Sequence, residues 1–296
     1  MLSETNKIKS IGVIGAGTMG SGIASVSALS GYITIVCDIY QQSLDKAEKN
    51  ILKGYDKLLE KGKLDETKKN KAVSNLEFTT DIKRIAGCGI VIEAALEDLE
   101  LKRELYKKLD EITRDSCILA TNTSSFSITA ISSVVKDKSK VIGMHFFNPA
   151  NIMKLVEIIK GEFTSEETVS IVNELTKSLG KTPVMCSDTP AFIVNRVARP
   201  FYGEALKILG EGGIPVETID KIMKSEGGFA MGPFELMDLI GIDVNFSVTK
   251  SVYGAFFYDQ KYKPSPIQQK MVEAGLLGRK TGEGFYKYTP AIPAKA

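Results

Sequence analysis

The sequence predicts an α/β protein in which a doubly wound sheet is followed by a mainly α-helical domain. Short apolar runs alternate with helical patterns from residue 8 to residue 188, which is typical of a parallel sheet covered on both faces. From residue 191 onward, helical patterns follow one another and strand patterns nearly stop. The length of 296 residues agrees with two domains of roughly 150 residues each.

The individual elements follow from the period of the apolar residues and from the Gly and Pro residues between them. Strands are predicted at 8–15, 32–38, 76–80, 89–94, 117–121, 140–145, 153–160 and 182–188. Helices are predicted at 17–30, 43–60, 99–114, 126–135 and 165–179, then at 191–210, 216–225, 233–240 and 243–257. No element is predicted in the Lys-rich stretch that ends at Asn75. We therefore predict a sheet domain over 1–187, a helical domain over 188–288 and a flexible tail over 289–296.

Composition excludes several classes of protein. Lys and Arg total 38 against 36 Asp and Glu, whereas nucleic-acid binders usually have a marked basic excess. One histidine, His145, leaves no His-rich metal site, and we expect no bound metal. Cys37, Cys88, Cys117 and Cys186 lack metal-ligand spacing, so we expect buried free thiols in a reducing cytoplasm. The beginning of the chain lacks a signal-peptide pattern, and no run reaches the 18 or so apolar residues of a membrane span.

A glycine-rich motif predicts a dinucleotide site. Gly15, Ala16, Gly17, Thr18, Met19 and Gly20 form GxGxxG, which follows an apolar strand and opens a helix. The first Gly permits the turn, the second admits the pyrophosphate, and the third lets helix and strand pack closely. Asp38 ends the next strand, where a carboxylate bonds the ribose 2′-OH. No Arg or Lys follows at 39–42 to receive a 2′-phosphate. The motif predicts a Rossmann-type domain that binds NAD; the alternative is a plain turn with a helix-capping Asp.

The single histidine is the candidate acid–base group. His145 ends a predicted strand at the carboxyl edge of the sheet, where ligands bind in this architecture. Glu157 lies in the strand 153–160 on the same face as Met153, Leu155 and Ile159. A charge on an apolar face needs a partner, and His145 is a candidate on the neighbouring strand. A carboxylate on one ring nitrogen would leave the other as a general base. The alternative is a satisfied core histidine.

Seven motifs are spread along the chain. They are Gly15–Gly20, Glu93–Glu97 (EAALE), Asn122–Ser125 (NTSS), His145–Pro149 (HFFNP), Pro190–Arg196 (PAFIVNR), Gly232–Leu236 (GPFEL) and Lys280–Tyr286 (KTGEGFY). Together they resemble the motifs of the short-chain L-3-hydroxyacyl-CoA dehydrogenase family, in the expected order from about residue 7 to residue 288. Within the family, the chain is similar to the bacterial 3-hydroxybutyryl-CoA dehydrogenases.

The resemblance implies an NAD-dependent enzyme that interconverts (S)-3-hydroxybutyryl-CoA and acetoacetyl-CoA. It implies that His145 is the catalytic base, that Glu157 orients it, and that Ser124 and Asn195 bond the substrate. The matching cofactor positions are Ala95, Glu97, Lys102, Ser124, Asn148 and Lys280, besides the glycine loop and Asp38. Without the resemblance, structural alternatives remain open for these residues. Ser124 could cap a helix, and Asn195 could form a capping or inter-helix hydrogen bond. The side chains of Glu97, Lys102, Asn148 and Lys280 could simply be polar groups exposed to solvent.

A basic helix is a candidate surface for the phosphates of an acyl-CoA. Lys49, Lys53 and Lys57 share one face of the helix 43–60, and Lys61 continues the line. We expect that some of Lys53, Lys57 and Lys61 contact CoA. The alternative is a solvated face, because Glu48, Asp56 and Glu60 interleave with these lysines.

Two further expectations concern assembly and rival functions. The apolar helices between 190 and 257 exceed what one bundle buries, so we expect a homodimer or a higher homo-oligomer. A rival enzyme is a sugar-acid dehydrogenase, which would need a carboxylate-binding Arg and no CoA surface. A rival from another class is a dinucleotide sensor that kept the fold and lost turnover.

Overall fold

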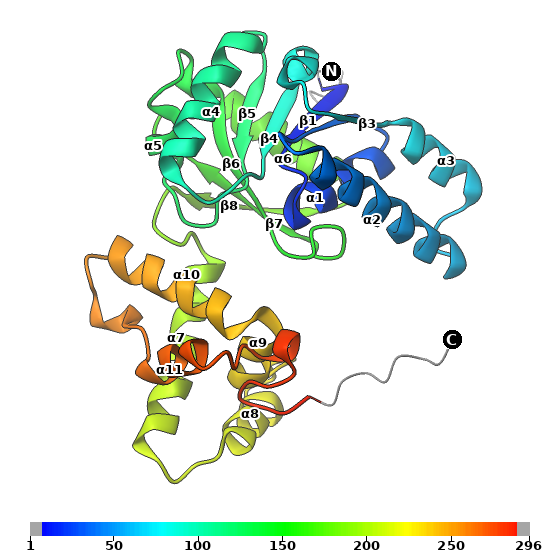
Figure 1. Cartoon of the computed structure of the whole chain (residues 1–296). Helices are drawn as coiled ribbons and strands as arrows, with labels where there is room; N and C mark the ends of the chain where they lie inside the picture. The colour runs from blue at the N-terminus through cyan, green and yellow to red at the C-terminus, as the bar shows by residue number, and fades with distance from the viewer. Residues whose placement is uncertain (1–7, 289–296) are drawn as a thin grey trace. The chain divides into compact units, whose positions relative to one another are not determined.

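The computed structural model describes residues 8–288 (Figure 1). The chain divides into two compact units between Phe192 and Ile193, whereas the sequence places the boundary after Ser187. The tail predicted over 289–296 lies outside the described residues.

The first unit is built on one sheet of eight strands in the order β3-β2-β1-β4-β5-β6-β7-β8. Its strands are β1 (Ser10–Ile14), β2 (Ile33–Cys37), β3 (Leu76–Thr79), β4 (Ile90–Glu93), β5 (Ile118–Thr121), β6 (Val141–Phe146), β7 (Leu155–Lys160) and β8 (Thr182–Ser187). From β3 to β6 every neighbouring pair is parallel. The strand order reverses beside β1, as in doubly wound folds that bind dinucleotides.

The sequence predicts a parallel sheet, and this prediction is wrong for one pair of strands. β7 runs antiparallel to β6, and β8 runs parallel to β7. The reason is the connection: only residues 147–154 join β6 to β7, whereas a parallel crossover needs a dozen or more residues. The reversal places β7 directly beside the end of β6 that carries His145.

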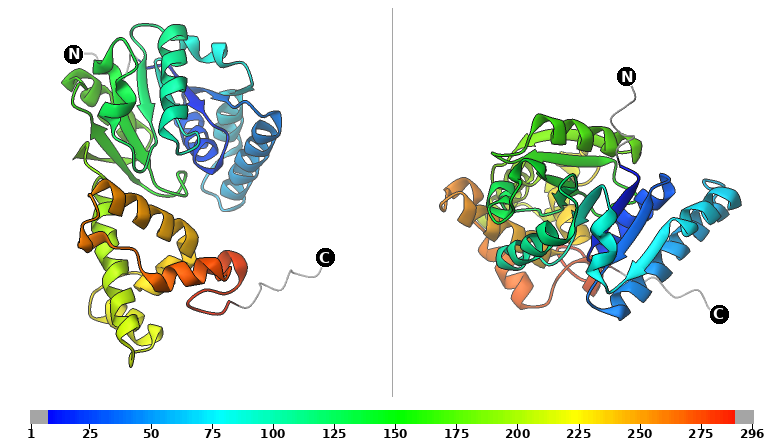
Figure 2. Two further views of the ribbon diagram at one scale, coloured as in Figure 1. Left: turned by 60° about the vertical axis from the view of Figure 1, so that its left-hand side comes forward. Right: turned by 90° about the horizontal axis from the view of Figure 1, so that it is seen from above.

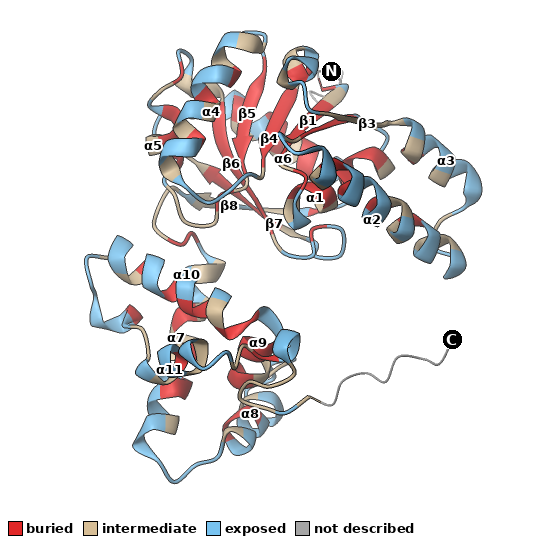
Figure 3. Cartoon of the chain, viewed as in Figure 1, coloured by how far each residue is buried: buried red, intermediate tan, exposed pale blue. Residues whose placement is uncertain are grey.

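Helices cover both faces of the sheet because its central strands are apolar on both sides. In β4, Ile90 and Ile92 belong to one buried cluster and Val91 to the other. The first cluster includes residues of α1 (Thr18–Leu29), α2 (Gln41–Glu60), α3 (Glu66–Ser74) and α6 (Glu166–Ser178). The second includes residues of η2 (Ile82–Gly87), α4 (Leu99–Ile112) and α5 (Ile128–Ser132). Figures 2 and 3 show this arrangement and the buried strands between the helices.

All four cysteines are free, as predicted. Cys37, Cys88 and Cys117 are buried, whereas Cys186 is half-buried. Burial raises the pKa of Cys37 to about 11 and that of Cys117 to about 12. These thiols therefore stay protonated at neutral pH and are poor nucleophiles.

The described residues of the second unit contain helices and two isolated β-bridges but no strand. Its elements are α7 (Val194–Glu211), α8 (Val216–Ser225), α9 (Pro233–Ile240), α10 (Ile242–Ala255), η4 (Gln260–Tyr262), α11 (Pro266–Glu273) and η5 (Arg279–Thr281). Tyr202, Leu206, Phe234, Met237 and Ile242 form the centre of its core. Helix α11 was not predicted from the sequence, although Ser265 caps it and Pro266 occupies its first turn, both of which are start signals.

Two buried aspartates hold the last described segment on this unit. Asp220 accepts hydrogen bonds from the first-turn amides of α9 and from the Tyr286 hydroxyl. Asp238 accepts from the amides of Phe285 and Tyr286 and from the Tyr288 hydroxyl. Gly284 is required here because a Cβ would lie 2.3 Å from the Asp238 carboxylate. The segment Lys280–Tyr286 therefore has a structural role.

Candidate active site

The loop between β1 and α1 needs its three glycines for different reasons. Gly15 has a φ of +94°, and a Cβ there would lie 2.6 Å from the carbonyl oxygen of Ala94. A Cβ on Gly20 would lie 1.7 Å from the carbonyl oxygen of Gly15, so this Gly lets the helix pack against the loop. A Cβ on Gly17 would meet no protein atom within 4 Å. Gly17 therefore keeps open a space that the protein itself does not fill.

The surroundings of this space suit the pyrophosphate of NAD. Helix α1 begins after Gly17, has no side-chain cap, and has no acidic residue in its first turn. The first amides of a helix lack partners within it, so those of Thr18 and Met19 and the positive end of the helix dipole suit an anion. The Asp38 carboxylate accepts a hydrogen bond of 2.7 Å from the Ala16 amide and one of 3.0 Å from Tyr40. The predicted ribose-binding residue thus lies directly beside the glycine loop.

His145 and Glu157 form the contact that the sequence predicts. They are directly opposite each other in the antiparallel pair of β6 and β7, and Nδ1 of His145 lies 2.7 Å from Oε2 of Glu157. The two residues are 6% and 1% exposed. Phe147 and Phe192 lie against the imidazole, with ring centroids 4.7 and 5.8 Å away. The ring is therefore fixed in place, with one nitrogen committed to a buried carboxylate.

Four neighbouring strands bring the predicted groups to one edge of the sheet. β1, β4, β5 and β6 are adjacent and parallel, so the segments after their carboxyl ends lie together. Asn122 follows β5, and its side-chain oxygen accepts a hydrogen bond of 2.8 Å from the amide of Phe146, next to His145. This bond ties the loop that carries Ser124 to the end of β6. No role was predicted for Asn122 from the sequence.

A buried ion pair underlies this edge. Glu93, at the end of β4, is fully buried and accepts from Lys102 Nζ at 2.6 Å, Thr121 Oγ1 at 2.7 Å and the Ala95 amide at 2.7 Å. Lys102 is only 2% exposed, so the alternative of a solvated charge is wrong for it. Breaking such a pair by removing one partner typically costs about 3–5 kcal/mol. No role was predicted for Glu93 from the sequence, although its charge at the end of the apolar run 89–92 was a usable signal.

Glu97 connects this ion pair to the loop of Ser124. Its Oε2 lies 3.3 Å from Lys102 Nζ. Its Oε1 accepts from the hydroxyl of Thr123 and from the amides and hydroxyls of Ser124 and Ser125, at 2.7 to 3.2 Å. Burial alone raises the pKa of Glu97, but Lys102 and these donors outweigh it and lower the pKa. Glu97 is therefore a firmly ionised hydrogen-bond acceptor.

The other predicted site residues belong to other elements. Asn148 is exposed in the loop before β7, and Lys53, Lys57 and Lys61 are exposed along α2 and at its end. In the second unit, Asn195 is partly exposed in the first turn of α7. Lys280 donates to both oxygens of Asp243 at 2.6 and 2.7 Å. Within residues 8–288, no group of His, Cys, Asp and Glu could hold a metal ion, and no helix is long and apolar enough to cross a membrane.

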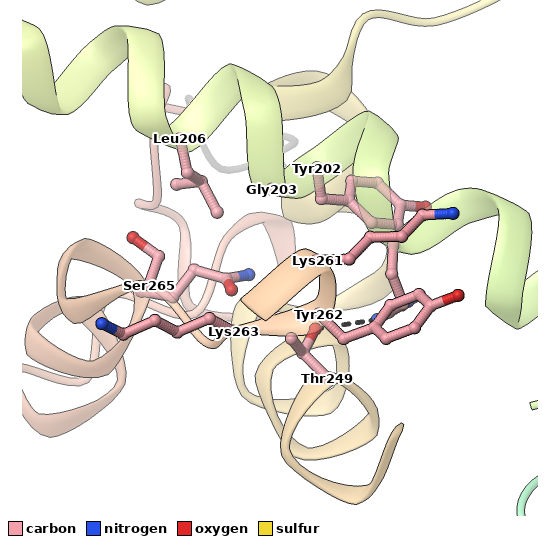
Figure 4. A pocket seen from close by; sticks show the side chains of 10 residues that line it. Tyr202, Gly203, Leu206, Thr249, Lys261, Tyr262, Lys263 and Ser265 are labelled. Carbon is pink, nitrogen blue, oxygen red and sulfur yellow. Dashed lines mark hydrogen bonds between the residues drawn. The ribbon is translucent and has the colours of Figure 1, made fainter. Parts of the chain in front are cut away.

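A small cavity in the second unit is lined by α7, α10, η4 and α11 (Figure 4). Its volume is about 10 Å³, which is room for about one water molecule. Arg199 is 5% exposed and donates to the carbonyl oxygen of Asn245 and to the Thr249 hydroxyl. Figure 4 shows Lys261 and Lys263 pointing in opposite directions. The buried arginine therefore joins α7 to α10, and the cavity is too small for a substrate.

Comparison with known proteins decides the family. The model of the 3-hydroxyacyl-CoA dehydrogenase NAD-binding domain matches residues 10–189. The model of the C-terminal domain of 3-hydroxyacyl-CoA dehydrogenase matches residues 192–288. The chain belongs to the 3-hydroxyacyl-CoA dehydrogenase family. As a member of this family it is an NAD-dependent dehydrogenase, and the first unit is its NAD-binding domain.

Individual relatives are similar in sequence to this chain over nearly its whole length. A probable 3-hydroxybutyryl-CoA dehydrogenase of Deinococcus radiodurans is 46% identical over 94% of this chain and 99% of that protein. The crystal structure of (S)-3-hydroxybutyryl-CoA dehydrogenase from Ralstonia eutropha is 41% identical, with a TM-score of 0.91, over 95% of this chain and 99% of that one. The 3-hydroxyadipyl-CoA dehydrogenase of Escherichia coli is 46% identical over 95% of this chain, which spans only 59% of that protein.

Proposed function

We propose that this chain interconverts (S)-3-hydroxybutyryl-CoA and acetoacetyl-CoA with NAD. The observation that carries the proposal is the buried His145–Glu157 pair at the sheet edge that also bears the glycine loop. The relatives of matching length are named for the four-carbon substrate. The family membership favours this substrate class over a sugar acid.

His145 accepts the proton in the oxidation and returns it in the reduction. Oxidation of the alcohol removes a hydride from C3 and a proton from the 3-hydroxyl, which leaves a ketone. Nε2 of His145 takes the proton, while Glu157 fixes Nδ1 and stabilises the positively charged ring. Bound NAD supplies the acceptor for the hydride. Reduction of the ketone returns the same proton from His145.

The remaining groups bind and orient the substrate. Ser124 contacts the oxygen on C3, and Asn195 of α7 contacts the same substrate. Some of Lys53, Lys57 and Lys61 bind the phosphates of CoA. Glu97, Lys102, Asn148 and Lys280 contribute to the cofactor site, as the resemblance implies, together with the glycine loop, Asp38 and Ala95. We further propose that the chain functions as a homodimer.

The decisive variant is His145→Gln. Its amide can still donate to Glu157, but it cannot take up a proton, so we expect kcat to fall by roughly 10²–10⁴-fold while the Kd for NADH stays unchanged. NADH oxidation is followed with acetoacetyl-CoA and, separately, with an oxidised sugar acid. Near-normal turnover of the variant would remove the assignment. Wild-type turnover of the sugar acid alone would replace the proposed substrate.

A further inference from the structure

Lys181 is a buried cation that lies directly before β8. It is only 8% exposed, and its Nζ donates to the carbonyl oxygens of Ala150 at 2.6 Å and of Met153 at 2.8 Å. Among the described residues it has no carboxylate partner, and burial lowers the pKa of its ammonium group. A buried charge needs partners, and here two backbone carbonyls are those partners.

Both carbonyls belong to the loop 147–154, which joins the strand of His145 to the strand of Glu157. Within this loop, the carbonyl oxygen of Pro149 accepts from the amides of Ile152 and Met153, each at 2.9 Å. The Lys181 ammonium supplies the donors for the carbonyls of Ala150 and Met153. The turn of the loop is therefore closed by its own amides and by one side chain from outside it.

The loop 147–154 lies against the first helix of the dinucleotide site. Ala150 is 2% exposed and belongs to the same buried cluster as residues of α1. A Cβ on Gly22 of α1 would lie only 3.0 Å from the Cβ of Ala150. Asn148, the cofactor residue implied by the resemblance, is exposed and lies two residues before Ala150. The ammonium of Lys181 therefore holds the segment that carries Asn148.

The backbone of Lys181 gives this side chain a rigid support. Helix α6 ends in a left-handed turn at Gly180, which has a φ of +68°. The amide of Lys181 then donates to the carbonyl oxygen of Thr176 at 3.1 Å, and that of Thr182 donates to Lys154 at 2.8 Å. The position of the ammonium is thus fixed by α6 and by the start of β8.

We propose that Lys181 is a positioning residue for the cofactor, which holds the loop 147–154 against α1 so that Asn148 is in place before NAD binds. Its printed contacts in the loop are with the backbone, so it acts through Asn148. A group that is already ordered loses less conformational freedom on binding, which raises affinity. This inference rests on the proposed function, in which Asn148 contributes to the cofactor site.

The test removes the donors of Lys181 and keeps the bulk of its side chain. Lys181→Met leaves an unbranched apolar side chain beside the two carbonyls. We expect the Kd for NADH to rise by roughly three- to tenfold, the worth of about one net hydrogen bond. The kcat at saturating NADH and acetoacetyl-CoA should fall by a smaller factor, because the pairing of β6 with β7 still holds His145 beside Glu157.

A double-mutant cycle separates this role from a merely structural one. If Lys181 acts through Asn148, the loss of NADH affinity caused by Lys181→Met should largely disappear in the background of Asn148→Ala. Lys177→Met is the matched control. It removes an exposed lysine of α6 that pairs with Glu174, and it should leave the Kd for NADH unchanged.

Gly22→Ala displaces the same loop without removing a buried charge. Its Cβ forces Ala150 to move by a few tenths of an ångström. We expect the Kd for NADH to rise in this variant as well, and the rise to depend on Asn148. This variant tests the inference even if Lys181→Met does not fold.

The outcomes distinguish this inference from the proposed function. An unchanged Kd for NADH in the folded variants, or a loss of equal size with and without the Asn148 side chain, would overturn the positioning role alone. If Asn148→Ala by itself leaves the Kd for NADH unchanged, the assignment of Asn148 in the proposed function fails, and this inference fails with it.

Discussion

We expect two glycines of the loop after β1 to have different roles, one in cofactor binding and the other in the packing of the fold. Gly17 borders open space, whereas Gly20 faces the carbonyl oxygen of Gly15 at a distance that no real Cβ tolerates. Gly17 has a φ of −69°, which alanine adopts without strain. The same substitution should therefore have opposite consequences at the two positions.

We expect Gly17→Ala to fold normally and to lose affinity for NADH, because its methyl group occupies the space for the pyrophosphate. The Kd should rise roughly tenfold or more, while the unfolding free energy changes by less than about 1 kcal/mol. Gly20→Ala should destabilise by about 1–3 kcal/mol or more through overpacking. Thermal unfolding and NADH titration measure both effects. Wild-type NADH affinity of Gly17→Ala would contradict the assigned pyrophosphate position.

At the residue scale, the sequence predicts contacts best where a charge interrupts an apolar pattern. Glu157 on an apolar strand face led to His145, and the structure has that hydrogen bond. The catalytic role of the pair stays a prediction. Glu93 also ends an apolar run, but its partner Lys102 lies on helix α4, and a strand pattern does not show which helical residue reaches the strand. Asn122 was missed because its partner is the backbone amide of Phe146, which no side-chain pattern reveals.

At the scale of elements, helix α2 separates a buried face from a basic one. Leu44, Ala47, Ile51 and Tyr55 are buried, whereas the lysines at 49, 53 and 57 are exposed. Asp56, one of the carboxylates that interleave with them, forms an ion pair of 2.7 Å with Lys69 of α3. This pairing leaves the exposed face of α2 more positive than its sequence suggests.

Reversing the charge at Lys53, Lys57 and Lys61 to Glu should raise the KM for acetoacetyl-CoA by roughly tenfold, since each exposed ion pair contributes about 0.2–1 kcal/mol. The effect should shrink at high salt because exposed charges are screened. An acetoacetyl thioester without the nucleotide part of CoA should keep its KM. Charge reversal at Lys107 and Lys108, exposed on α4, is the control. An unchanged KM for acetoacetyl-CoA in the triple variant rejects this surface.

Elements were predicted where apolar periodicity is strong and missed where it is weak. Helix α3 buries only Ala72, so no apolar stripe reveals it, although the Lys68 amide donates a capping hydrogen bond to Asp65, which is a recognisable N-cap pattern. The predicted helix 126–135 is reduced to α5 (Ile128–Ser132). The direction of β7 was missed because period-2 patterns identify a strand and not its orientation.

At the scale of the whole molecule, the fold class was predictable because the period of the apolar residues, the Gly and Pro residues between elements and the sequence motifs all indicate the same fold. The strand–helix alternation of the first unit and the helical succession of the second are both present, and the family models match both parts. The oligomeric state is harder to predict than the fold class, because the structure of a single chain shows an interface only as exposed apolar surface.

That surface predicts a dimer formed through the second unit. Val197 and Ile208 of α7 are 69% and 38% exposed, and their spacing places them on one stripe of the helix. Leu239, Ile240 and Val244, around the junction of α9 and α10, are 41–49% exposed. Exposed apolar side chains become buried when a second copy covers them, so we expect these residues to contribute to an interface.

We therefore expect the protein to elute in gel filtration at about twice the 32.2 kDa of one chain. The double variant Val197→Asp and Leu239→Asp should shift the protein toward the monomer, because a charge without a partner in the apolar centre of an interface costs several kcal/mol. Leu101→Asp, at a half-exposed leucine on α4 of the first unit, should stay dimeric. Elution of the wild type at the mass of one chain, unchanged on concentration, would refute the dimer. A dimer that survives the double variant would place its interface on another surface.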